Sequence, residues 1–248
     1  MRSTNAQRGW IPAGLCTLML VTTGCHGPFE RVETDSIGNT WLGPVTIAIA
    51  PAINLSGASD FDPNRFADLM ASELSYAEKV SVVPVSRVLN VLAAQGVEGV
   101  ESSTHALELT KLLGADAILI FAVTEYDPYD PPSLGVTAQL YGASFGSNGW
   151  SVDPVALSRQ AGLADSPGRR DERGLLARTQ RVFNASHEDV AADIRRYAAR
   201  RGSEGSPYGW RRFVVSQRDF VRYCCHATIR ALLDARQESE RVGRRRDG

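Results

Sequence analysis

Three carboxylates and two tyrosines share one short stretch, TEYDPYDPP, at residues 124–132. The carboxylates follow an apolar run, and carboxylates just beyond a buried strand can bind a metal ion or act as general acid and base. Together with a histidine from elsewhere in the chain, the three carboxylates would form the active site of a metal-assisted hydrolase. The Asp-Pro and Pro-Pro pairs are instead typical of a turn that leaves a sheet. We favour the turn, as a partner-contact loop without catalytic residues. The contact residues predicted are Glu125, Tyr126, Asp127, Tyr129 and Asp130.

The sequence Cys224-Cys225-His226 also carries groups that bind metals or react as thiols. Successive residues of a helix turn by about 100°, so Cys224 and His226 lie about 200° apart and cannot share one ion. Cys225 falls within an apolar stripe, and His226 falls with Arg222 and Arg230 on the other side. We therefore predict structural packing here, with no metal site and no cofactor.

The N-terminus carries a third reactive group, the thiol of Cys25. Arg2 and Arg8 precede a short apolar run at 15–21, and small residues then lead to Gly24 and Cys25. The run is too short to span a bilayer. The pattern resembles the lipobox of bacterial lipoproteins, which implies cleavage before Cys25, a diacylated lipid (palmitate) attached to its sulfur through a thioether, and acylation of the new N-terminus. Several acyl chains hold a protein on a membrane far more firmly than one.

Two features depart from the lipobox: Thr22 stands where leucine is usual, and Pro12 interrupts the apolar run. An ordinary cleaved signal peptide and a plain apolar tail are the alternatives. His26 after the cysteine is compatible with sorting to the outer membrane, so we expect a lipid-anchored, periplasm-facing protein of the cell envelope.

Composition indicates a globular chain that does not bind nucleic acid. The 248 residues are 43% hydrophobic, and the formal net charge is -1. Arginines cluster late in the chain without the interleaved aromatic residues of a base-stacking surface. The predicted divisions are a signal peptide (1–24), a tether (25–43), an α/β core (44–143), a mobile insertion (144–174), a strand plus helices completing the same domain (175–238) and a disordered basic tail (239–248).

Hydrophobic periodicity predicts strands alternating with helices. The strands are at 45–50, 79–86, 115–128, 133–143 and 175–186. The helices are at 62–78, 86–96, 103–114, 187–201 and 216–240. Asp62, and Ser103 or Thr104, are the expected N-caps, and Glu73 is the one polar interruption of the first helix's apolar positions. The order predicts an α/β fold, a two- or three-layer sandwich with a mixed sheet of four to five strands and a C-terminal helix.

Residues 44–141 resemble the periplasmic α/β domain of the CsgG, LpoB and TolB N-terminal-domain superfamily. The shared features are a strand ending in "P…N.SG", a helix of the "FAD.L…EL" kind and a later "GAD.I…VTEY" strand. The matching positions are Pro51, Asn54, Ser56, Gly57, Phe66, Ala67, Asp68, Leu69, Glu73, Leu74, Gly114, Ala115, Asp116, Val123, Thr124, Glu125 and Tyr126.

The resemblance implies a protein-binding assembly or activator module of the envelope, not an enzyme. Its partner would be an envelope protein, and an oligomer is possible. The alternatives are the hydrolase at residues 125–130 and a CsgG-like secretion-pore subunit, although only 133–143 has the alternation of a membrane-spanning hairpin.

Overall fold

A computed structural model describes residues 36–39, 43–142 and 174–246, except for the side chains of residues 204 and 239–246. The predicted signal peptide, Cys25, most of the predicted tether and residues 144–173 lie outside the described residues.

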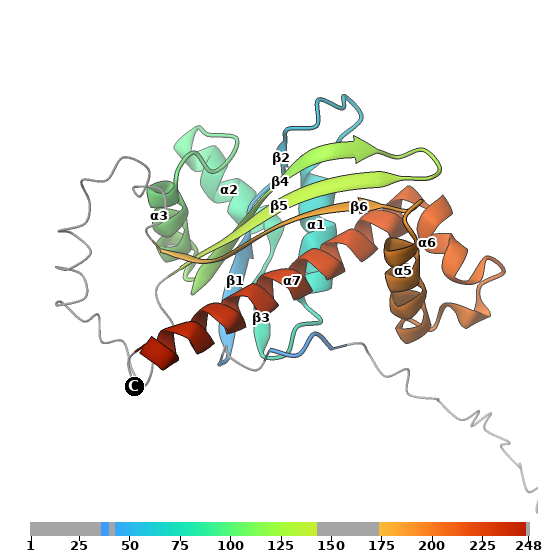
Figure 1. Ribbon diagram of the computed structural model, residues 1–248. Helices are drawn as coiled ribbons and strands as arrows, with labels where there is room; N and C mark the ends of the chain where they lie inside the picture. The colour runs from blue at the N-terminus through green and yellow to red at the C-terminus, as the bar shows by residue number, and fades with distance from the viewer. Residues whose placement is uncertain (1–35, 40–42, 143–173, 247–248) are drawn as a thin grey trace, which may run out of the picture. The chain divides into compact units, whose positions relative to one another are not determined.

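The described strands form one mixed sheet in the order β3-β1-β4-β5-β6, with the two-residue β2 beside β4 (Figure 1). β1 pairs in parallel with β3 and β4, and β2 pairs in parallel with β4, whereas β5 is antiparallel to both β4 and β6. The mixed α/β sheet predicted from the sequence is confirmed. The strands are β1 (Val45–Ile49), β2 (Ile53–Asn54), β3 (Val80–Val83), β4 (Ala117–Asp127), β5 (Ser133–Gly142) and β6 (Leu175–Asn184).

The helices begin and end largely where the sequence places them. They are α1 (Pro63–Leu74), α2 (Val85–Gln95), α3 (Ser103–Leu113), α5 (Glu188–Arg200), α6 (Arg212–Val215) and α7 (Gln217–Arg246), with 3-10 turns η2 (Ser203–Gly205) and η3 (Gly209–Arg211). Asp62 caps α1 as predicted. The prediction for α3 is wrong by one residue, because Ser102 accepts the capping hydrogen bond from the His105 N–H.

Helices cover both faces of the sheet, in three layers. On the face that we call inner, strand residues such as Leu119 and Phe121 share one apolar cluster with α1, α5, α6 and α7. On the outer face, alternate residues such as Ala48 and Ile118 share a second cluster with α2 and α3. This double burial explains the nearly unbroken apolar run of β4.

A β-bulge at Thr124 changes which residues of β4 face inward. The pairing with β5 shifts between Val123 and Glu125, so the alternation restarts after Thr124. Val123 and then Tyr126 thereby face the inner layer, and Glu125 does not. A Cβ atom added to Gly135, opposite the bulge, would lie 2.6 Å from the Thr124 Oγ1.

The described part of the predicted tether pairs with the end of the α1–β3 connection. The Ile37 N–H donates to the Tyr76 carbonyl at 3.0 Å, and the Glu78 N–H donates to the Ile37 carbonyl at 3.0 Å. Ile37 is buried. At the other end of the chain the backbone of α7 is helical through Arg246, whereas the sequence predicts a tail from residue 239. Within the described residues no helix is long and apolar enough to cross a membrane.

Candidate functional site

The predicted contact residues occupy the end of the β4–β5 hairpin (Figure 1). Glu125 accepts a 2.6 Å hydrogen bond from the Ser133 hydroxyl, and Asp127 accepts one of 3.1 Å from the Tyr129 N–H. Tyr129, at the tip, is 79% exposed, and the neighbouring Asp130 is also exposed. Each carboxylate thus either belongs to the local hydrogen bonding of a turn or faces outward.

Tyr126 differs from its neighbours because the bulge turns it inward. Its ring lies 5.8 Å from that of Phe61 and 5.6 Å from that of Phe66, both edge-on. The Gln217 side chain at the start of α7 hydrogen-bonds the Tyr126 hydroxyl. Burial, and then the charge of Asp60, raise the pKa of Tyr126. These contacts give Tyr126 a structural role, fixing the hairpin to α1 and α7.

The structure places His105 and His226 away from the three hairpin carboxylates. His226, on α7, lies against Glu73 and not against the hairpin, and His105 lies on α3, with its Nε2 3.0 Å from the Gln95 amide oxygen. Among the residues described, no group of three or more His, Cys, Asp or Glu side chains could hold a metal ion.

The outer face of the sheet next to the hairpin is partly open. Figure 1 shows the hairpin extending past α2 and α3, which contact the sheet near the start of β4. Beyond them, the pairing places Ile53, Ala122, Thr137 and Gln180 in one row across β2, β4, β5 and β6. Ile53 and Gln180 are exposed, and Val182 in the next row is 58% exposed. We call this surface, together with the hairpin tip, the hairpin surface.

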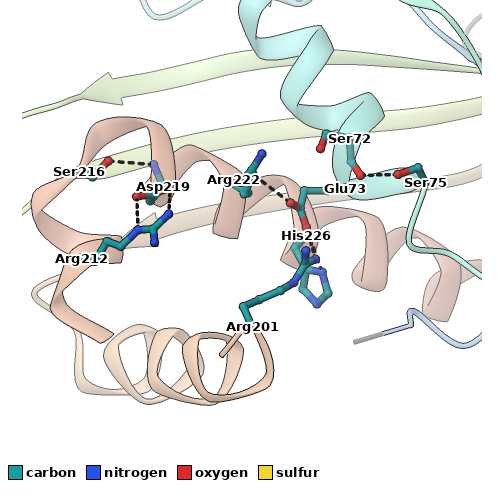
Figure 2. Close-up of polar contacts among 9 residues, drawn as sticks. All are labelled: Ser72, Glu73, Ser75, Arg201, Arg212, Ser216, Asp219, Arg222 and His226. Carbon is teal, nitrogen blue, oxygen red and sulfur yellow. Dashed lines mark hydrogen bonds and ion pairs between the residues drawn. The ribbon is translucent and has the colours of Figure 1, made fainter. Parts of the chain in front are cut away.

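A second polar site is buried on the inner side, around Glu73 of α1 (Figure 2). The Arg201 Nη2 donates to the Glu73 Oε2 at 2.6 Å, and the Arg222 Nε lies 3.3 Å from the Oε1. The His226 Nδ1 lies 3.5 Å from the Oε2. Glu73 has no exposed side-chain surface, so it depends on these partners for the interactions that water would otherwise supply.

Aromatic rings surround this ion cluster. The Arg201 guanidinium carbon lies 3.9 Å from the centre of the Tyr76 ring and 5.0 Å from that of Tyr197. The Tyr197 ring also lies 4.8 Å from the His226 ring. Burial, and then the charge of Glu73, raise the pKa of Tyr197 far above its ordinary value. The cluster therefore joins α1, the end of α5 and the first half of α7 around a carboxylate that has no exposed surface.

The sequence reading places His226 and Arg222 on the wrong side of α7. Both contact Glu73, and His226 is 2% exposed. The one sequence feature that indicates this ion cluster is Glu73, a carboxylate within the apolar stripe of α1, because a carboxylate buried there needs a cationic partner. Nothing local identifies Arg201 or Arg222 as that partner.

Cys224 and Cys225 pack in the core, as predicted. Both are free thiols of the inner apolar cluster. Burial raises the pKa of each, to well above its ordinary value for Cys224. Thiolates are the reactive form, so this environment makes both side chains inert.

A second ion pair joins α6 to the first turn of α7 (Figure 2). The Arg212 Nε donates to the Asp219 Oδ2 at 2.7 Å, and the Ser216 hydroxyl lies 3.3 Å from the Asp219 N–H, which donates to it. Burial raises the pKa of Asp219, but the hydrogen bond and charge of Arg212 outweigh burial, so the net pKa is lowered.

No family model matches the chain, and no curated protein matches it. It is similar to several solved structures. One is the LpoB C-terminal domain from Salmonella enterica, with 10% identity and a TM-score of 0.40, over 59% of this chain and 87% of that one. A lipoprotein from Neisseria meningitidis has 22% identity and a TM-score of 0.33, over 50% and 99%. The PelC dodecamer from Paraburkholderia phytofirmans has 20% identity and a TM-score of 0.26, over 42% and 65%.

Proposed function

We propose that the chain is a lipid-anchored protein of the bacterial cell envelope that binds a protein partner through its hairpin surface and catalyses no reaction. The anchor is the acylated Cys25, and the outer membrane is the favoured location. The observation that carries the proposal is the exposed hairpin tip, where Tyr129 is flanked by Asp127 and Asp130.

The direction of α5 supports this assignment. Just before α5, the Ala185 N–H donates to the Pro132 carbonyl at 3.0 Å, beside the hairpin. α5 is thirteen residues long, and Arg201, which follows it, stacks on Tyr76, whose carbonyl accepts the Ile37 N–H. A helix of that length spans about 20 Å. Ile37, the first buried residue described after the proposed anchor, thus lies near one end of α5, and Pro132 of the hairpin lies near the other.

Site-specific photo-crosslinking in cells tests the proposal. A photoreactive phenylalanine analogue at Tyr129 should give a discrete crosslinked species, which Asp127→Ala weakens. The same analogue at Leu112, which is 58% exposed on α3, is the matched control and should give none. Equal crosslinking from both positions, or none from Tyr129, contradicts the proposed binding surface. Intact-mass measurement of Cys25 tests the anchor separately.

A further inference from the structure

A basic aromatic patch lies on the segment that follows α5. The guanidinium carbon of Arg195 lies 4.6 Å from the centre of the Trp210 ring, and that of Arg211 lies 5.7 Å from it. Tyr208, two residues before the tryptophan, is 68% exposed. We call Arg195, Tyr208, Trp210 and Arg211 the Trp210 patch. The hairpin surface does not include it. Tyr208 is exposed, whereas Trp210 is half-buried and packs in part against the inner apolar cluster.

The chemistry of the patch matches a membrane interface. Tryptophan and tyrosine combine an apolar body with a polar N–H or O–H, and they are favoured where one end of a side chain is apolar and the other wet. Arginine donates paired hydrogen bonds to phosphate and is attracted to anionic lipid headgroups. Arg195 also contacts Glu188 at 2.7 Å, so the positive charge comes chiefly from Arg211.

The length of the entering chain allows the same occupant. The Arg201 guanidinium stacks 3.9 Å from the Tyr76 ring, and the Tyr76 carbonyl accepts the Ile37 N–H. The segment that carries Tyr208 and Trp210 starts directly after Arg201. From Cys25 to Ile37 the chain is twelve residues, which reach at most about 40 Å when extended. In the proposed anchored state, the tether is therefore long enough for the patch to meet the surface that holds the anchor.

We infer that the Trp210 patch rests on an anionic phospholipid surface when the chain is anchored. This inference depends on the proposed lipid anchor and adds an orientation to it. Two attachments, one covalent lipid and one interfacial patch, limit the rotation of the folded body about a flexible tether. The hairpin surface is then presented in a restricted range of directions instead of being free to point toward the membrane.

Depth-dependent fluorescence quenching tests the inference on the lipidated protein, reconstituted in phosphatidylcholine vesicles with about a third phosphatidylglycerol. Tyr208→Cys carries the fluorophore, and Tyr129→Cys and Leu112→Cys are matched exposed controls. The buried native thiols do not compete for the label. We expect a bilayer-bound quencher to act about two- to threefold more strongly at position 208 than at 129 or 112. Arg211→Ser should reduce that ratio in anionic vesicles.

Equal quenching at the three positions overturns the inference. So does protection of position 208 in cells but not in vesicles, because a protein would then cover the patch. If Cys25 is found unmodified, the proposed lipid anchor is contradicted, and the inference about the patch is not. In that case the Cys25→Ser chain still reports on the patch, through the difference between its binding to anionic and to zwitterionic vesicles. That difference should fall with Tyr208→Ala and stay unchanged with Tyr129→Ala, since both tyrosines are exposed.

Discussion

Arg201 and Glu73 are 128 positions apart in the chain, yet an Arg201 N–H reaches a Glu73 carboxylate oxygen at 2.6 Å. The contact fastens the end of α5 to α1, and Arg222 adds α7 to the same carboxylate. The C-terminal helices are thus attached to the core by apolar packing and by one buried charge with cationic partners. Breaking a buried ion pair on one side costs more than a surface pair, because the remaining charge stays uncompensated.

Replacing Glu73 with glutamine should destabilise the protein strongly. Glutamine keeps the shape but leaves Arg201 and Arg222 facing each other without the carboxylate, and we expect a loss of about 3–5 kcal/mol in the free energy of unfolding. Urea denaturation followed by circular dichroism measures it. Asp68→Asn, on the exposed side of α1, is the control and should change stability by less than about 0.5 kcal/mol.

The double variant Glu73→Gln with Arg201→Met should cost less than the sum of the two single changes. The double variant leaves one fewer unpaired buried charge than Glu73→Gln alone. We expect the two losses of unfolding free energy to differ from additivity by about 1–3 kcal/mol. Strict additivity of the two losses would show that Glu73 and Arg201 do not act as a pair.

Alanine at Gly135 should destabilise the hairpin, and a second substitution should relieve the loss. The added Cβ would lie 2.6 Å from the Thr124 Oγ1 and 3.0 Å from the Glu125 Cβ. We expect Gly135→Ala to cost about 1–3 kcal/mol in unfolding free energy. Adding Thr124→Ala removes the closest atom and should recover part of that loss in the same denaturation assay. If Thr124→Ala adds to the loss instead, the close approach at the bulge is not its cause.

Stability should depend on pH through Asp219. Its folded pKa is lowered, so its contribution is fully present above the ordinary value near 3.8 and is lost as pH falls through the folded pKa. Relative to Asp219→Asn, the natural chain should be more stable by about 1 kcal/mol at pH 7, and the difference should shrink below pH 3.8. Arg212→Leu should remove most of the same difference. Denaturation curves between pH 3 and 7 measure it, and a gap that widens in acid contradicts the assignment.

Cys224 and Cys225 should resist alkylation in the folded protein. Burial raises the pKa of both thiols and excludes the reagent. In a Cys16→Ser, Cys25→Ser chain, a chromogenic disulfide reagent at pH 8 should titrate no thiol within minutes and both thiols in urea. Rapid labelling without denaturant would mean that α7 leaves the core.

The sequence was sufficient for what depends on local patterns. Alternation of strands and helices predicted the mixed sheet, and the Asp62 cap of α1 follows from its place before Pro63. The partners of Glu73 were not predictable, because helical periodicity orients a side chain only relative to its own helix. His226 was misplaced for this reason: its neighbours on α7 are arginines, and the carboxylate that draws it inward belongs to α1.

The bulge at Thr124 is a second feature that local sequence patterns do not predict. Strict alternation after Val123 would turn Glu125 inward and Tyr126 outward, whereas one extra residue reverses both. The prediction that both residues contact a partner assumed that neither was needed by the core. Tyr126 packs against Phe61 and Phe66 instead, so we give it a structural role in the proposal.

The pairing of Ile37 has a mechanical consequence. In the anchored state proposed above, a pull between the membrane and a bound partner would reach the domain at Ile37, which two backbone hydrogen bonds join to Tyr76 and Glu78. These bonds lie outside the sheet's own ladder, so they yield before β1 does. Their rupture would release the eight positions from Ile37 to Val45, whose fully extended length is about 27 Å, so the tether would lengthen by less than that. The attachment can thus lengthen under load while the domain keeps its fold.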